Sequence, residues 1–148
     1  MGKNSPIATI GIFSKNNTRI LKIIMSNTFK ANEAWIAIRI NDLFQPGMVN
    51  DIYVLMDAAS EYIFGNVLLN TVNVVPEEED IEILFRKAIA ITITSKWPNK
   101  LIMPEHSIAE DVFLTLAEKK GITFSTVPLL NLRPIMKPLK ESFAPIFR

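Results

Sequence analysis

A strand–turn–strand pattern that carries one carboxylate at its turn constrains the fold of this chain most. It occupies residues 51–70, with the sequence DIYVLMDAASEYIFGNVLLN. The apolar run Tyr53–Met56 has the length of a buried strand, and a second run, Tyr62–Leu69, contains Gly65. A glycine inside a strand marks a bulge or a close approach of another group. The stretch therefore predicts a β-hairpin, with Asp57 at the end of its first strand.

Two helices are predicted after this hairpin. The first begins at Pro76 and the acidic run behind it, because proline suits the first helical turn and carboxylates suit the positive end of the helix dipole. Its buried face carries apolar residues at helical spacing: Ile81, Leu84, Phe85, Ala88 and Ile89. The second helix begins at a capping box formed by Ser107 and Glu110, buries Ile108, and ends at Gly121.

The other segments of this half predict further strands and a late helix. Residues 71–75, 100–103 and 122–127 have strand character, and the tail after Pro128 has apolar residues at helical spacing, interrupted by prolines. The predicted order from residue 51 onward is β, β, β, α, β, α, β, α. This order favours an α/β fold in which helices flank a mixed sheet.

The chain length predicts one domain with two parts. A chain of 148 residues builds one substantial core and is too short for two independent ones. The break at Pro46-Gly47 separates a small N-terminal β-rich element, residues 1–50, from the core, residues 51–148. The N-terminal element holds an apolar hairpin over 8–25 and an isoleucine-rich segment over 35–40, interpreted as a strand with a short helix as the alternative. An isolated hairpin must pack on something, so it either extends the domain's own sheet or pairs with a second copy of the chain, and a homodimer is expected.

Composition excludes several kinds of site. The absence of cysteine rules out disulfides, thiolate nucleophiles and cysteine-based zinc sites, and the single histidine, His106, rules out a histidine-rich metal site. No apolar run reaches the length of a membrane span or of a signal peptide. A cytoplasmic protein without a membrane partner is therefore expected.

Charge gives little support for nucleic-acid binding over the chain as a whole. The net charge is +1, from 16 basic and 15 acidic residues. A local basic face is still allowed by lysines and arginines of the tail and the second helix: Arg133, Lys137, Lys140, Arg148, Lys119 and Lys120. A solvated helix surface is the more common explanation of such charges.

The hairpin with its acid and the later strand–helix step resemble the ribonuclease H-like fold of nucleases, integrases and transposases. The resemblance rests on VLMDAAS at 54–60 and LIMPEHS at 101–107, and covers about residues 35–143. The stretch 35–69 is also similar to an uncharacterised bacterial domain family, in which a tryptophan-bearing segment precedes a strand with an Asp-x-x-Ser turn. In integrase-like enzymes one acid ends the first strand and a second ends the strand before a helix, positions held here by Asp57 and Glu105.

The resemblance implies metal-dependent phosphoryl chemistry as one function. Asp57 and Glu105 would hold Mg²⁺ or Mn²⁺, and Glu141 on the last helix, or Asp111, would be the third catalytic acid. The family usually has an aspartate followed by Asn-Gly at the second site, whereas here Glu105 is followed by His106 and Ser107.

The same residues allow a function without metal. Asp57 then forms a turn by accepting hydrogen bonds near Ser60, and Glu105 is an exposed acid that precedes a helix. The expected function is therefore a non-catalytic interaction module on a ribonuclease H-like scaffold, with no cofactor. The alternative is a metal-dependent nuclease or strand-transfer relative that uses Asp57 and Glu105.

Overall fold

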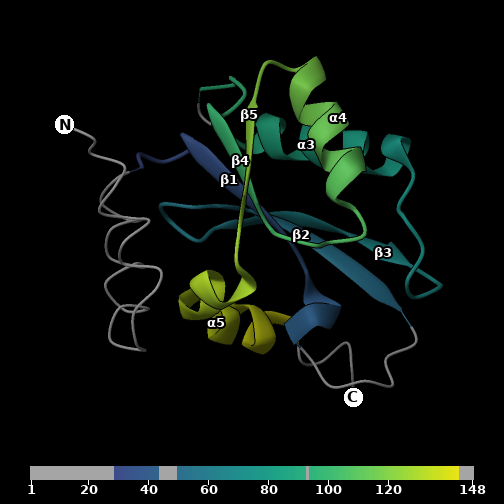
Figure 1. Ribbon diagram of the computed structural model, residues 1–148. Coiled ribbons are helices and arrows are strands. Elements are labelled where there is room, and N and C mark those ends of the chain that lie inside the picture. The colour runs from purple at the N-terminus through teal and green to yellow at the C-terminus, as the bar shows by residue number, and fades with distance from the viewer. Residues whose placement is uncertain (1–28, 44–49, 93, 144–148) are drawn as a thin grey trace.

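A five-stranded mixed sheet forms the centre of the molecule (Figure 1). The computed structural model describes residues 29–43, 50–92 and 94–143, so the hairpin predicted over 8–25 lies outside the described residues. The strand order is β3-β2-β1-β4-β5. The strands are β1 Ala34–Arg39, β2 Asp51–Asp57, β3 Ile63–Leu69, β4 Lys100–Pro104 and β5 Thr123–Val127.

Helices cover both faces of this sheet. Helices α3, Glu78–Ile91, and α4, Glu110–Lys119, lie on one face, and α5, Arg133–Phe143, lies on the other (Figure 1). Two 3-10 helices, η1 Ile40–Leu43 and η2 Leu129–Leu132, pack with α5. The α/β class with a mixed sheet flanked by helices is confirmed, and it is compatible with a ribonuclease H-like fold. Within the described part of the chain, no helix is long and apolar enough to cross a membrane.

The middle strand, β1, lies within residues 1–50, which were expected to form a separate N-terminal β-rich element. It pairs antiparallel with β2 and parallel with β4, and β4 pairs parallel with β5. The proposed division at residue 50 is therefore wrong, because residues 34–43 belong to the core. Residues 34–38 are fully buried. The continuous apolar run thus reflects a central strand covered on both faces.

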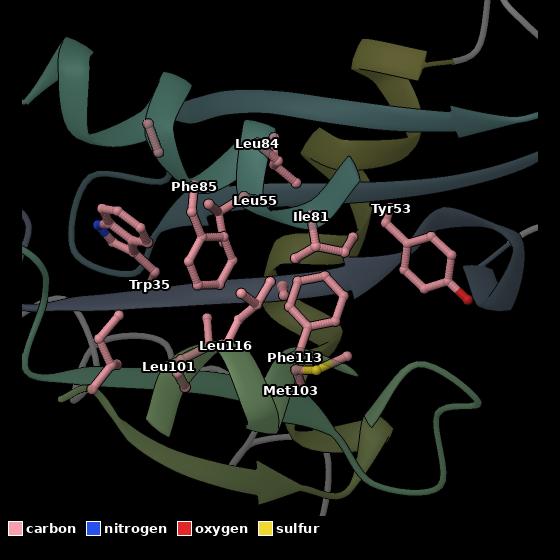
Figure 2. Packing of buried hydrophobic residues seen from close by; sticks show 14 of the residues in the cluster. Trp35, Tyr53, Leu55, Ile81, Leu84, Phe85, Leu101, Met103, Phe113 and Leu116 are labelled. Atoms are coloured by element: carbon pink, nitrogen blue, oxygen red, sulfur yellow. The ribbon is translucent and has the colours of Figure 1, made fainter. Parts of the chain in front are cut away.

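Successive residues of β1 and β2 enter two different apolar layers, as the pleat of a strand requires. The layer under α3 and α4 is shown in Figure 2 and includes Trp35, Tyr53, Leu55, Ile81, Leu84, Phe85, Leu101, Met103, Phe113 and Leu116. The layer under α5 includes Ile36, Ile38, Ile52, Val54, Ile102, Leu132, Ile135, Leu139 and Phe143. The sheet therefore separates the apolar residues that pack against α5 from those that pack against α3 and α4.

Both predicted helices of the middle region are present, but the start of the second differs from the prediction. α3 buries Ile81, Leu84, Phe85 and Ala88. α4 begins at Glu110, and the capping box is wrong, because the Ser107 hydroxyl accepts a hydrogen bond from the backbone N of Ala109 at 3.2 Å, before the helix starts. Ile108 is consequently 43% exposed. The end of α4 is as predicted, with Gly121 at φ +72°.

Residues 71–75 form a turn, in contrast to the predicted edge strand. Asn73 has φ +61°, and its backbone N donates to Asp51 Oδ2 at 2.7 Å. Its side-chain oxygen accepts a hydrogen bond from Arg39 Nη2 at 3.0 Å. A residue in this conformation, bound to a carboxylate through its N–H, cannot extend a strand ladder.

Gly65 lies where the pairing of β2 with β3 changes register. Leu55 pairs with Gly65, whereas the next residue of β2 pairs with Ile63, so β3 has one extra residue here. A Cβ atom on Gly65 would lie 3.2 Å from Lys87 Cδ and 3.3 Å from Leu84 Cδ1. The predicted bulge and the predicted close approach are both confirmed.

Candidate functional site

Asp57 ends β2 as predicted, and its side chain is buried, with 3% exposed. Its Oδ1 accepts a hydrogen bond from the backbone N of Asn32 at 2.6 Å. Its Oδ2 accepts two more, from the backbone N and the hydroxyl of Ser60, both at 2.8 Å. The carboxylate thus ties the turn before β1 to the turn after β2. This geometry is that of the turn-forming aspartate considered from the sequence.

Glu105 lies at a different level of the sheet from Asp57. Asp57 pairs with Trp35, and Trp35 pairs with Leu101 on the other side. Glu105 is four residues beyond Leu101, which corresponds to about 13 Å along the strands at about 3.3 Å per residue. Metal ions in a two-metal site are about 4 Å apart. The structure therefore does not bring these two carboxylates together.

Glu141, the third predicted acid, is exposed on α5. Asp57 lies on the α3 and α4 side of the sheet, because it alternates with Tyr53 and Leu55 of that layer. The sheet therefore separates Glu141 from Asp57. The side chain of His106 is 90% exposed, and its Nε2 is 3.9 Å from Glu105 Oε1. Over residues 29–43, 50–92 and 94–143, no group of three acidic or imidazole side chains is arranged to hold a metal ion.

The described basic residues that the sequence allowed to form one face are divided by the sheet, and Arg148 lies outside the described residues. Arg133 and Lys137 lie on α5, whereas Lys119 and Lys120 lie at the end of α4 on the opposite side. These lysines form ion pairs with glutamates of α3: Lys119 with Glu78, and Lys120 with Glu82. The hydrogen bond from Lys120 lowers the pKa of Glu82. The described residues of the two groups therefore do not form the one basic face that the sequence allowed, and the two lysines connect α4 to α3.

A buried ion pair that the sequence analysis missed occupies the end of β1. Arg39 Nε donates to Asp51 Oδ1 at 2.6 Å, and Asp51 is fully buried. Continuing the parallel register from Ile36 and Ile102 brings Arg39 level with Glu105. A guanidinium therefore occupies the end of the first strand of the sheet, where the resemblance implies an acid beside Glu105. Asp57 is expected at this position if β2 is the first strand, whereas the first described strand along the chain is β1.

Arg39 also binds the turns on either side of this ion pair. Its Nη1 is 3.0 Å from Asp42 Oδ1, and its Nη2 donates to Asn73 at 3.0 Å. Burial opposes the charge of the guanidinium, but the hydrogen bond and the charge of Asp51 outweigh it and raise the pKa of Arg39. One feature of the sequence is consistent with this network. Arg39 lies at the end of one apolar segment, Asp51 lies at the start of the next, and the two side chains have opposite charges.

Tyr53 is two residues from Asp51 on the same face of β2, and its buried hydroxyl has no hydrogen-bond partner among the described residues. Burial, followed by the charge of Asp51, raises the pKa of Tyr53 to about 12. An unfolded tyrosine ionises near pH 10. As pH rises, Tyr53 therefore loses its proton in the unfolded chain before it does so in the folded chain. The contribution of the protonated hydroxyl to stability is fully present below about pH 10 and is lost between about pH 10 and pH 12.

We expect a Tyr53→Phe variant to lose less stability than the wild type at alkaline pH, because phenylalanine has no hydroxyl to ionise. Between pH 9 and pH 11, the wild type should lose about 1 kcal/mol more free energy of unfolding than the variant, since one pKa unit corresponds to about 1.4 kcal/mol. Urea unfolding at both pH values measures the difference. Equal losses in the two proteins would show that the hydroxyl ionises normally in the folded chain.

A surface pocket of about 440 Å³ lies beside Asp57. Residues from the turn before β1, the hairpin and the end of α3 line it: Asn32, Asp57, Ser60, Tyr62, Phe64 and Ile91. Most of its lining is apolar. The hairpin residues of the pocket lie in residues 51–70, the stretch that the sequence patterns emphasise. The rest of the lining comes from segments far away in the chain, so local patterns do not predict the pocket.

Comparisons with known proteins give no family for this chain. No family model and no curated protein matches it. A cryo-EM structure of the simian T-cell lymphotropic virus intasome in complex with PP2A regulatory subunit B56 gamma contains a similar chain, at 14% sequence identity and a TM-score of 0.46. The match covers 76% of this chain but only 42% of the other. The fold class therefore rests on the sheet topology, and similarity to a bacterial domain family stays a prediction.

Proposed function

We propose that this chain is a non-catalytic binding module on a ribonuclease H-like scaffold. The observation that carries the proposal is the guanidinium of Arg39 at the end of β1, which donates to the fully buried Asp51 at 2.6 Å. A metal site at this end of the sheet needs a second carboxylate beside Glu105. A fixed guanidinium there repels a divalent cation instead.

The alternative, a metal-dependent nuclease or strand-transfer relative, requires Asp57 and Glu105 to share one metal site. Their separation of about 13 Å along the strands argues against it. The hydrogen bonds that Asp57 accepts from Asn32 and Ser60 supply a sufficient structural reason for a carboxylate at this position. Homodimer formation remains a prediction, because the hairpin that suggested it lies outside the described residues.

The proposal predicts that divalent metal leaves the melting temperature unchanged. An ion that binds only the folded chain raises this temperature by mass action. We expect no rise with about 5 mM Mg²⁺ or about 1 mM Mn²⁺. A metal ion whose dissociation constant lies far below these concentrations would stabilise the folded chain by about 2 kcal/mol or more. A rise that disappears in both Asp57→Asn and Glu105→Gln variants would contradict the proposal and support the enzyme.

The structural role of Asp57 makes a separate prediction without metal. Asp57→Asn should lower the free energy of unfolding by about 1–3 kcal/mol, because an amide N–H₂ replaces an oxygen that accepts from a buried N–H. Ser60→Ala, which removes a hydroxyl that donates to Asp57 and accepts from the backbone N of Tyr62, should cost about 1 kcal/mol. Urea unfolding measures both. A more stable Asp57→Asn protein would instead indicate that several acids repel one another around Asp57.

A further inference from the structure

We propose that the pocket beside Asp57 binds a small organic amine, in which a protonated nitrogen is carried on an apolar body. The volume of about 440 Å³ lies within the range of about 300–1,000 Å³ that is usual for small-ligand sites. This inference goes beyond the proposed function and takes from it only that Asp57 holds no metal.

The carboxylate of Asp57 supplies a negative charge that no basic side chain among the described residues pairs with. A carboxylate offers about four acceptor positions. Two on Oδ2 are filled by Ser60 and one on Oδ1 is filled by Asn32, which leaves one position on Oδ1. A buried charge without a counter-ion is costly, so a cationic N–H donor is the favoured ligand group.

Three other side chains of the pocket, Asn32, Ser60 and Thr92, use their polar hydrogens within the protein. Asn32 Nδ2 donates to a threonine hydroxyl at 3.1 Å and to a backbone carbonyl at 2.9 Å. The Ser60 hydroxyl donates to Asp57, and the Thr92 hydroxyl donates to a carbonyl at 2.9 Å. These groups therefore offer acceptors to a ligand more readily than donors. At these three side chains, an N–H group of a ligand finds an acceptor, whereas a carboxylate or a phosphate finds no donor.

The walls of the pocket suit the apolar body of such an amine. Tyr62 and Phe64 pack edge to face, with ring centroids 5.8 Å apart. Tyr62 is 55% exposed and Ile91 is 44% exposed, so two large apolar side chains at one pocket are open to solvent. An alkyl or aryl group in the pocket would cover them. The exposed ring of Tyr62 also attracts a cation through its π face.

The test titrates the full chain at neutral pH with three six-carbon probes that differ only in their polar group: hexylamine, hexanol and hexanoate. We expect hexylamine to bind about tenfold or more tightly than hexanol, because a hydrogen bond to a charged group is worth at least that factor, and hexanoate to bind most weakly. Amide NMR shifts should concentrate near Ser60 and Phe64 and be absent from β5. Equal binding of the three probes, or shifts centred elsewhere, would overturn the proposal.

Two variants locate the site without relying on Asp57. Tyr62→Ala should weaken hexylamine binding by about threefold or more, since it removes an exposed aromatic wall. Leu130→Ala, at a side chain 52% exposed on η2 and outside the pocket, is the matched control and should change nothing. Asp57→Asn, if it folds, should make hexylamine and hexanol bind equally. Equal effects of Tyr62→Ala and Leu130→Ala would place the binding elsewhere.

The protonated nitrogen can come from a free amine or from a lysine of a polypeptide. A short peptide with one central lysine, compared with the same peptide carrying acetyl-lysine, separates the two sources. Binding by hexylamine alone supports a small-molecule ligand, and tighter binding by the lysine peptide supports a protein partner. Binding by neither overturns the proposal. The metal titration is independent of all these outcomes, so failure of the proposed function remains distinguishable.

Discussion

Replacing Arg39 with methionine is expected to lower the free energy of unfolding by about 3–5 kcal/mol. The substitution keeps much of the side-chain volume but leaves the fully buried carboxylate of Asp51 without its cation. Arg86→Met is the matched control, because Arg86 is 71% exposed and pairs with Glu82 on the surface of α3. That change should cost less than about 1 kcal/mol. Urea unfolding of both variants measures the contrast, and equally small losses would contradict it.

A second variant tests whether the loss comes from the uncompensated charge. Asp51→Asn in the Arg39→Met background should recover part of the lost stability, because neither member of this ion pair then leaves a buried charge. The double variant should therefore be more stable than the Arg39→Met protein. A double variant that is less stable would indicate that Asp51 stabilises the fold chiefly through its hydrogen bond to Asn73.

Phe85→Ala is expected to have an effect of similar size, about 3–5 kcal/mol, by leaving a cavity in the layer under α3 and α4. Its ring centroid lies 5.9 Å from that of Trp35, 6.0 Å from that of Phe113 and 6.3 Å from that of Trp97 (Figure 2 shows the first two). Removing the ring therefore takes a partner from three aromatic side chains on different elements.

Two controls on the same helix separate packing from helix propensity. Ile83→Ala, at a side chain 59% exposed, should stay within about 0.5 kcal/mol. Phe85→Leu should cost less than Phe85→Ala, since it leaves a smaller cavity. Thermal melting checks the series, with about 2–4 °C expected per kcal/mol for a chain of this size. A small effect of Phe85→Ala would mean that the surrounding rings close the cavity.

Elements with a local signal could be predicted from the sequence, and the arrangement of strands could not. The apolar spacing of α3 lies within one helix, and the run of β2 lies within one strand. The central position of β1 depends instead on pairing with β4, more than sixty residues away. Because that pairing is not predictable from local patterns, the sequence predicted Asp57 beside Glu105, and the strand register does not bring the two together.

The candidate site follows the same division. The turn-forming role of Asp57 was predictable from the Asp-x-x-Ser spacing, since its bonds to Ser60 are local. The contact of Asp57 with Asn32 and the contact of Arg39 with Asn73 join segments more than twenty residues apart. Periodicity within one element contains no information about such partners, so the buried ion pair and the pocket become visible only in the folded chain.

The first and last residues of β2 are both buried aspartates, and both receive backbone N–H groups from neighbouring turns. A slip of β2 by two residues would keep each side chain on its own face and would disturb an apolar run very little. The same slip would carry Asp51 away from the backbone N of Asn73 and Asp57 away from the backbone N of Asn32 at once. These acids therefore let the folding chain discriminate the correct alignment of its hairpin from neighbouring alignments that hydrophobic burial alone would tolerate.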